Sequence, residues 1–260
     1  MNIRKLAGLV AAAILAATPL AVLADNHEAQ PALASVWIFA PKQGETDKFE
    51  KAMREHAALR EKGGDTRDWS VYSVAIGDHM GIYQVRYCCF DWADEDAYSA
   101  ANTDKGFGEH FQKTVAPHVD HMHHYFEEMD FEMSSWPADM DDHEYVGVTS
   151  WVWKEGAGRA SSDARKKITQ VLMDEGWADD NHWLWHSRIG GKPMIMVAVP
   201  YENYADMAPP EETMYEFMLQ NSDMDAEELD ATFQAFGSGF SSSDYTVWQS
   251  RPDLSVSTAD

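Results

Sequence analysis

The chain has 260 residues, with 20 basic and 44 acidic side chains and a formal net charge of −24. A field of that sign repels nucleic acid and anionic lipid surfaces, so we expect neither as a partner. Hydrophobic residues make up 45% of the chain and include ten tryptophans. That much apolar surface to bury excludes a disordered protein.

The first 24 residues are typical of a secretory signal. Arg4 and Lys5 form a charged start, residues 6–20 an apolar core, and Val22 and Ala24 the −3 and −1 positions of a cleavage site. The apolar run is shorter than the roughly 20 residues that a membrane span needs. We therefore expect export to the periplasm or the medium. Removal of 24 residues, two of them basic and none acidic, leaves 236 residues with a formal charge of −26.

The remaining chain repeats itself at an offset of 114 residues, which aligns Trp37 with Trp151 and Trp69 with Trp183. Further identities at this offset are Glu61 with Glu175, Gly77 with Gly191, and Tyr87 with Tyr201. Such self-similarity indicates two copies of one structural unit. We predict copies over 34–137 and 143–251, joined by a polar linker and followed by a disordered tail over 252–260.

The first copy alternates between strand-like and helix-like patterns. We predict strands at 34–40, 69–76, 80–90 and 131–136, helices at 47–62 and 107–129, and an acidic loop at 91–104. The long helix should be kinked or broken before Pro117. This β-α-β-β-α-β order is that of a ferredoxin-like unit.

The second copy repeats the order. We predict strands at 145–153, 182–189, 194–201 and 245–249, a helix at 162–175, and a helical region at 211–236 with a break near Asn221. A ferredoxin-like sheet has helices on one face only. Two units in one chain can therefore press their open sheet faces together, which gives an α+β barrel.

In this order and duplication the chain resembles the dimeric α+β-barrel superfamily. Its members include antibiotic-biosynthesis-type monooxygenases, NIPSNAP-like and EthD-like proteins, and haem-handling relatives of chlorite dismutase. The resemblance implies two tandem ferredoxin-like units that form a pseudo-dimeric α+β barrel. It also implies either a small-molecule site that works without a cofactor or a haem between sheet and helices, held by a helix histidine.

Histidines concentrate on the predicted helix 107–129. Its apolar residues Val115, Val119, Met122 and Phe126 recur at intervals of 4, 3 and 4, which predicts the face that lies on the sheet. His118 falls at the edge of this stripe and is our candidate catalytic residue or, by the resemblance, an axial haem ligand. His121 and His124 could share a divalent metal on one helix turn. The structural alternative is a partly solvated helix edge.

Two further features suggest ligand contacts. His182, His186 and Arg188 share one face of a predicted strand, which could form a polar wall for a small anion or a phenol, or an exposed edge. Trp37 and Trp69 could line an apolar cavity, although large aromatic residues on sheets are more often core.

The only two cysteines are neighbours, Cys88 and Cys89. Adjacent side chains in a strand point to opposite faces, so we expect two free thiols. The alternative is the disulfide that export permits.

These features favour an exported protein that binds a small apolar or aromatic molecule, with no cofactor or with haem. As an enzyme it would be a cofactor-independent monooxygenase-type oxidoreductase in which His118 positions or deprotonates the substrate. The alternatives are a haem protein that uses His118 and a non-catalytic binding or interaction module. The sequence has no phosphate-binding glycine loop, GxSxG motif or Cys/His zinc spacing.

Overall fold

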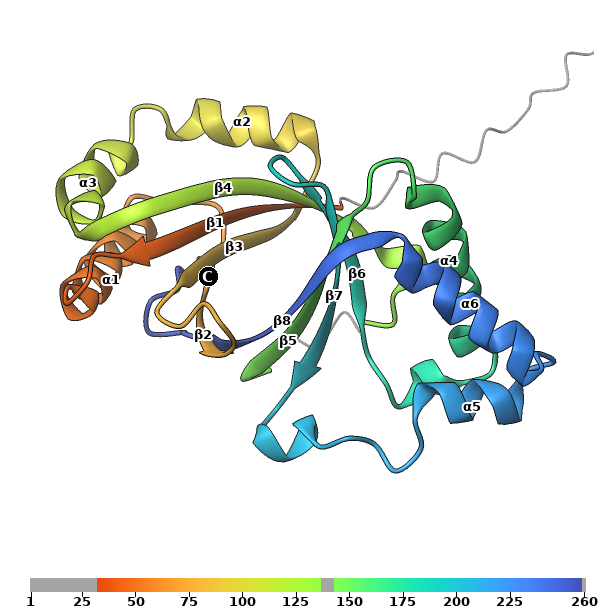
Figure 1. Ribbon diagram of the computed structural model, residues 1–260. Helices are drawn as coiled ribbons and strands as arrows, with labels where there is room; N and C mark the ends of the chain where they lie inside the picture. The colour runs from red at the N-terminus through yellow and green to blue at the C-terminus, as the bar shows by residue number, and fades with distance from the viewer. Residues whose placement is uncertain (1–31, 137–142, 259–260) are drawn as a thin grey trace, which may run out of the picture. The chain divides into compact units, whose positions relative to one another are not determined.

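The computed structural model describes residues 32–136 and 143–258. The predicted signal and residues 137–142 of the linker lie outside the described residues. The described strands are β1 (Leu33–Pro41), β2 (Ser70–Ile76), β3 (Tyr83–Phe90), β4 (Val119–Asp130), β5 (Tyr145–Trp153), β6 (Leu184–Ile189), β7 (Met194–Tyr201) and β8 (Phe240–Ser250). They form a closed barrel in the order β1-β3-β2-β8-β5-β7-β6-β4 (Figure 1).

The barrel consists of two sheets of the same internal order, β4-β1-β3-β2 and β8-β5-β7-β6. Each is the sheet of a ferredoxin-like unit, and antiparallel pairing of β2 with β8 and of β4 with β6 joins them. The helices are α1 (Thr46–Lys62), α2 (Trp92–Asn102), α3 (Phe107–Thr114), α4 (Gly158–Asp174), α5 (Met214–Asn221) and α6 (Ala226–Ser238). The predicted tandem ferredoxin-like α+β barrel is therefore confirmed. None of the described helices is long and apolar enough to cross a membrane.

Alternation along each strand separates an outer face from the inside of the barrel. On β1, Trp37 and Phe39 pack outward with Phe49 of α1. Val36 points the other way and packs with Met129 of β4. In Figure 1, α1 and α3 lie beside the strands of the first half, and α4 and α6 beside those of the second. Each half thus has its own core between sheet and helices.

The predicted helix 107–129 is wrong beyond its first two turns. α3 ends at Thr114, a short 3-10 turn covers Ala116–His118, and β4 begins at Val119. Pro117 cannot continue a helix because it lacks the backbone N–H. The following residues pair with β1 instead, which satisfies the backbone groups on one side of that strand.

The repeat offset also changes within this region. Trp37 lies opposite His124 on β4, whereas Trp151 lies opposite Ser243 on β8. Trp37 and Trp151 differ by 114 positions but His124 and Ser243 by 119, so the second half holds five additional residues here. The offset of 114 therefore does not align structural counterparts on β4 and β8.

Three smaller predictions are corrected. The expected acidic loop contains α2, which begins with a capping box between Asp91 and Asp94. The expected strand 131–136 is a 3-10 turn, Phe131–Met133, followed by an extended segment. Cys88 and Cys89 are joined by a disulfide rather than being free thiols.

The expected disordered tail is packed over its described part, 252–258. Leu254 is 1% exposed and belongs to the core of the first half. The backbone N–H of Val256 donates to the carbonyl of Trp69 at 2.9 Å. The end of the second copy therefore completes the core of the first.

Candidate functional site

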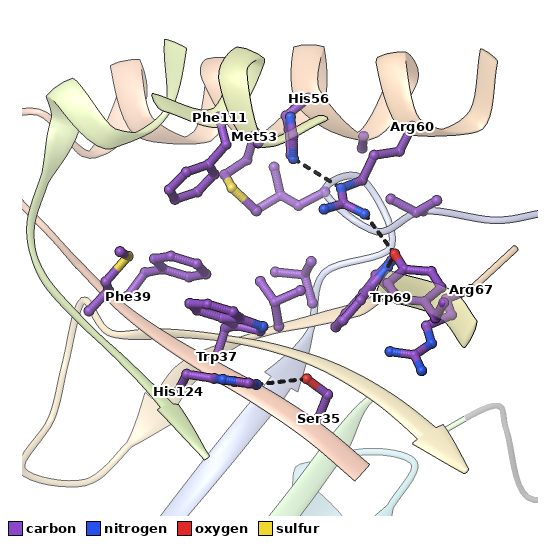
Figure 2. Close-up of a pocket in the computed structure, with 18 of the residues that line it drawn as sticks. Ser35, Trp37, Phe39, Met53, His56, Arg60, Arg67, Trp69, Phe111 and His124 are labelled. Carbon is purple, nitrogen blue, oxygen red and sulfur yellow. Dashed lines mark hydrogen bonds between the residues drawn. The ribbon is translucent and has the colours of Figure 1, made fainter. Parts of the chain in front are cut away.

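A cavity of about 340 Å³ lies between the first-half sheet and helices α1 and α3 (Figure 2). Strands β1 to β4 contribute to its walls, α2 contributes Glu95 and Tyr98, and the C-terminal segment contributes Leu254 and Val256. Its volume is within the range of small-molecule sites, roughly 300–1,000 Å³. It lies between sheet and helices, as the resemblance implied.

Aromatic side chains give the cavity flat apolar walls. Trp37 and Phe39, two residues apart on β1, have ring centroids 6.3 Å apart and planes inclined by 8°. Phe111 of α3 contacts Phe39 at 5.8 Å between centroids. Figure 2 shows Phe111 and Met53 on the helix side, facing Trp37 and Phe39 on the sheet side. A flat ring fits such a space better than a branched aliphatic chain.

The corresponding layer of the second half is filled by larger side chains. At the offset of 114, Val71 of the cavity corresponds to Trp185. Trp151, the counterpart of Trp37, is surrounded by Trp185, Phe236 and Phe240, with centroids at 5.7, 5.3 and 5.7 Å. The hollow in the first half therefore follows from smaller side chains on the same framework.

A buried histidine on α1 lines the helix side of the cavity. His56 is 6% exposed, and its Nε2 accepts a hydrogen bond of 3.0 Å from Nε of Arg60 (Figure 2). Because arginine stays protonated, Nε2 carries no proton, so neutral His56 donates from Nδ1 to Nδ1 of His110 at 3.1 Å. Burial, and then the Arg60 guanidinium, lower the pKa of His56 to about 3.

The Arg60 guanidinium continues this network towards α2. Its Nη1 donates to the Asp65 carboxylate and, at 3.0 Å, to the hydroxyl of Tyr98. That hydroxyl donates to Oδ1 of Asp65 at 2.9 Å and accepts from the indole N–H of Trp69 at 3.3 Å. Burial is the main cause that raises the pKa of Tyr98. These bonds fix the position of the Tyr98 ring on the cavity wall.

Arg67 separates the cavity from a second one of about 390 Å³ under α2, and it lines both. Its Nη1 donates to Glu95 at 2.6 Å, and its guanidinium lies 3.7 Å from the ring centroid of Tyr98 and 4.4 Å from that of Phe90. Stacking on aromatic faces and a carboxylate partner both stabilise a buried guanidinium.

His124 of β4 lies on the sheet side of the same cavity (Figure 2). Its Nε2 shares a hydrogen bond of 3.0 Å with Oγ of Ser35, and its ring lies 4.1 Å from that of Trp37 at 12°. Burial lowers the pKa of His124 and Glu95 opposes this. The imidazole is therefore neutral at neutral pH and can accept a proton.

His118 does not line the cavity. It lies at the end of the 3-10 turn before β4, and its Nδ1 is 3.0 Å from Oε2 of Glu45. The hydrogen bond with His118 is the first cause that lowers the pKa of Glu45 to about 2. His118 is thus hydrogen-bonded to a neighbour, as in the structural alternative.

The predicted metal pair loses its geometric basis. His121 and His124 are on a strand, where residues three apart point to opposite faces. His121 is exposed and its Nδ1 is 3.0 Å from Asp120, whereas His124 faces the cavity. No group of three or more His, Cys, Asp or Glu side chains within residues 32–136 and 143–258 could hold a metal ion.

The candidate ligand-binding residues that we predicted on the second-half strand lie in two different places. His182 precedes β6, and its Nδ1 donates to the carbonyl of Ser135 at 3.0 Å. His186 and Arg188 lie on β6 opposite Met129 and Glu127 of β4. They face the inside of the barrel, away from the cavity. Trp37 and Trp69, in contrast, both line it.

Sequence reasoning missed His56, Arg67 and Tyr98. His56 and Arg60 are four apart on a correctly predicted helix, which is the spacing at which helical side chains meet. Tyr98 was assigned to a loop, although the capping box at Asp91 was a readable helix start. Arg67 gave no signal, because its role depends on contacts with distant residues.

Comparison with known proteins finds similarity at the level of structure only. No family model matches the sequence, and no curated protein does. An anthrone oxidase-like protein superimposes with a TM-score of 0.54 at 9% identity, over 89% of this chain and 95% of that one. A protein assigned as a monooxygenase from Fusobacterium nucleatum superimposes with a TM-score of 0.51 at 9% identity, over 85% and 92%.

A chlorite dismutase variant from Candidatus Nitrospira defluvii, in complex with cyanide, gives a TM-score of 0.48 at 9% identity over 86% and 93% of the two chains. At these identities, the two superpositions with TM-scores above 0.5 show the α+β-barrel fold alone and not the activity.

The neutral state of His56 predicts a specific pH dependence of stability. Between pH 6.5 and about 3 the unfolded chain takes up a proton on this residue that the folded chain does not. The folded state therefore loses up to ~1.4 kcal/mol per pH unit as the pH falls through this window. Urea unfolding at pH 6.5, 5.5 and 4.5 should show this slope in the wild type and a shallower one in His56→Gln. The exposed control His123→Gln should follow the wild type, and equal slopes for wild type and His56→Gln would contradict the assignment.

Proposed function

We propose that the first-half cavity binds one small, flat, largely apolar molecule that carries a hydroxyl group. The observation that carries this proposal is the cavity of about 340 Å³ between the aromatic wall of Trp37 and Phe39 and the helix-side residue Phe111. Burial of a ring against such walls supplies most of the binding free energy, at about 25 cal/mol per Å² of apolar surface.

The polar side chains of the cavity favour a neutral ligand over an anion. Arg60 is paired with Asp65 and Arg67 with Glu95, so each guanidinium already has a carboxylate partner. An anion would compete with these carboxylates, whereas a hydroxyl group needs only one donor or acceptor. His124 on the sheet side offers a neutral imidazole for that purpose.

A second candidate function is oxidation of the bound molecule without a cofactor. His124 supports it, because a neutral imidazole on the cavity wall can take the proton of a phenol. The resulting phenolate is the electron-rich species that reacts with oxygen. This role replaces the one predicted for His118, which lies outside the cavity lining.

A haem held by His118 has no support in this geometry. Of the histidines that do line the cavity, His56 has both ring nitrogens in hydrogen bonds. His56 therefore offers no free ring nitrogen to a haem iron, and His118 lies outside the cavity lining.

Export remains part of the proposal and rests on residues 1–24 alone. A soluble binding protein outside the cytoplasm would meet its ligand from the medium or the periplasm.

The binding proposal predicts that 2-naphthol, a flat neutral phenol, binds the purified protein. Removal of the Trp37 ring should weaken binding at least about tenfold, since about 1.4 kcal/mol corresponds to a factor of ten and a buried aromatic ring contributes more. Isothermal titration calorimetry of wild type, Trp37→Ala and Trp151→Ala measures this. Trp151→Ala is the matched control in the filled second half and should keep the wild-type affinity. No binding by the wild type, or equal losses in both variants, would sink the proposal.

The oxidation candidate predicts oxygen uptake with 1,4-dihydroxynaphthalene above the protein-free rate. His124→Gln should lower that rate by about a hundredfold. Because the base must be unprotonated and burial lowers its pKa from the usual histidine range, the wild-type rate should fall only when the pH drops below that range.

His123→Gln, on the opposite face of the same strand, is the control and should keep the rate. A wild type that binds 2-naphthol but takes up no oxygen would exclude the oxidation while leaving the binding function in place.

A further inference from the structure

Charged side chains gather inside the barrel, on the face of the sheet away from the cavity. Glu127 and Met129 of β4 lie opposite Arg188 and His186 of β6, so all four share one face. Met129 packs there with Val36 in the interior cluster. Glu127 is 4% exposed and His186 is 7% exposed. These groups are therefore held away from bulk water.

The positive groups outnumber the negative one. Glu127 accepts at Oε2 from Nδ1 of His186 at 2.9 Å, and Nε of Arg86 lies 3.9 Å from the same oxygen. Burial opposes ionisation of Glu127, but His186, Arg86 and Arg188 outweigh it and hold its pKa below the usual range. One carboxylate thus faces two guanidinium groups and an imidazole. Arg86, with 23% of its side chain exposed, and Arg188 are only partly buried, so solvent screens this excess of positive charge in part and an anion would balance the rest.

Several donor atoms of this cluster lack a good acceptor. Nε of Arg188 is a donor that is buried without a hydrogen-bond partner among the described residues, and Nε2 of His186, which becomes a donor when the ring carries both protons, is also without one. Nη2 of Arg86 reaches only Sδ of Met129, at 3.2 Å, and a thioether is a weak acceptor. The Arg188 guanidinium packs on the ring of Tyr125, 4.2 Å from its centroid, and this contact supplies no acceptor for its Nε. The cluster is short of acceptors.

The side chains around this cluster limit the size of an anion that could bind to it. Neither of the two cavities described above is lined by His186 or Arg188. The neighbouring side chains Val36, Met129 and Leu184 are apolar and packed together. A single-atom anion requires less space than a phosphate or a carboxylate and accepts hydrogen bonds from any direction.

We propose that Arg86, His186 and Arg188 bind one chloride-sized anion inside the barrel. This site is independent of the cavity and of the function proposed for it. Its occupant would neutralise the cluster and add to the pairing of β4 with β6, one of the two contacts that close the barrel.

The test compares thermal unfolding of the purified protein in sodium chloride, sodium bromide and sodium gluconate at equal ionic strength. Chloride and bromide should raise Tm by about 2 to 4 °C over gluconate at several times the dissociation constant, with saturation. Arg188→Gln should remove the difference between chloride and gluconate whatever its own Tm. The control Arg159→Gln, at an exposed arginine of α4, should keep it.

His186→Gln gives an independent variant should Arg188→Gln fail to fold, and it too should remove the halide effect. An anomalous bromide peak between β4 and β6 in crystals grown with bromide would place the ion. Equal wild-type Tm values in chloride and gluconate would overturn the proposal. A halide effect that persists in Arg188→Gln or His186→Gln would also overturn it, because it would then arise elsewhere on the protein.

Discussion

Pairing between the two halves, β2 with β8 and β4 with β6, is the constraint on which the rest of the structure depends. It closes the barrel and turns the open faces of both sheets inward. Short segments that follow the last strand of each half strengthen it. Ser135 donates from its backbone to Trp183 of the second half at 3.0 Å, and Val256 donates to Trp69 of the first at 2.9 Å. Each half thus helps to complete the other, so we expect the halves to fold as one unit.

The same framework supports two different interiors between sheet and helices. In the second half, aromatic residues surround Trp151 and fill the layer. In the first half, the smaller Val71 lies at the position that corresponds to Trp185, and a cavity remains. In a duplicated fold, one half can have a filled core that stabilises the protein, while the other half has a less filled core that leaves room for a ligand. The polar network around Arg60 and the C-terminal segment form part of the walls of this hollow.

The sequence predicted the barrel and most strands, because these depend on local patterns and on a repeat that can be read directly. Trp37 and Trp69, which we expected to line an apolar cavity, both line the cavity of the first half. The prediction failed on β4, where apolar residues at helical spacing imitate an amphipathic helix, and only pairing with β1 decides the structure. Because of that error, we predicted His124 as half of a metal-binding pair, whereas it lies on a cavity wall. The prediction also missed α2, which buries no residue and so shows no apolar stripe. The network of His56 and the stacking of Arg67 depend on long-range contacts that no local pattern reports.

We expect the hollow first half, and not the filled second half or the barrel interior, to receive the ligand. A crystal structure of the purified protein with 2-naphthol tests this most directly. It should show ring density between Trp37 and Phe111, with the hydroxyl group towards His124 or the Tyr98 network. Density only at the second-half core or inside the barrel would contradict it. So would a first half whose own side chains collapse into the cavity and leave no room for a ring.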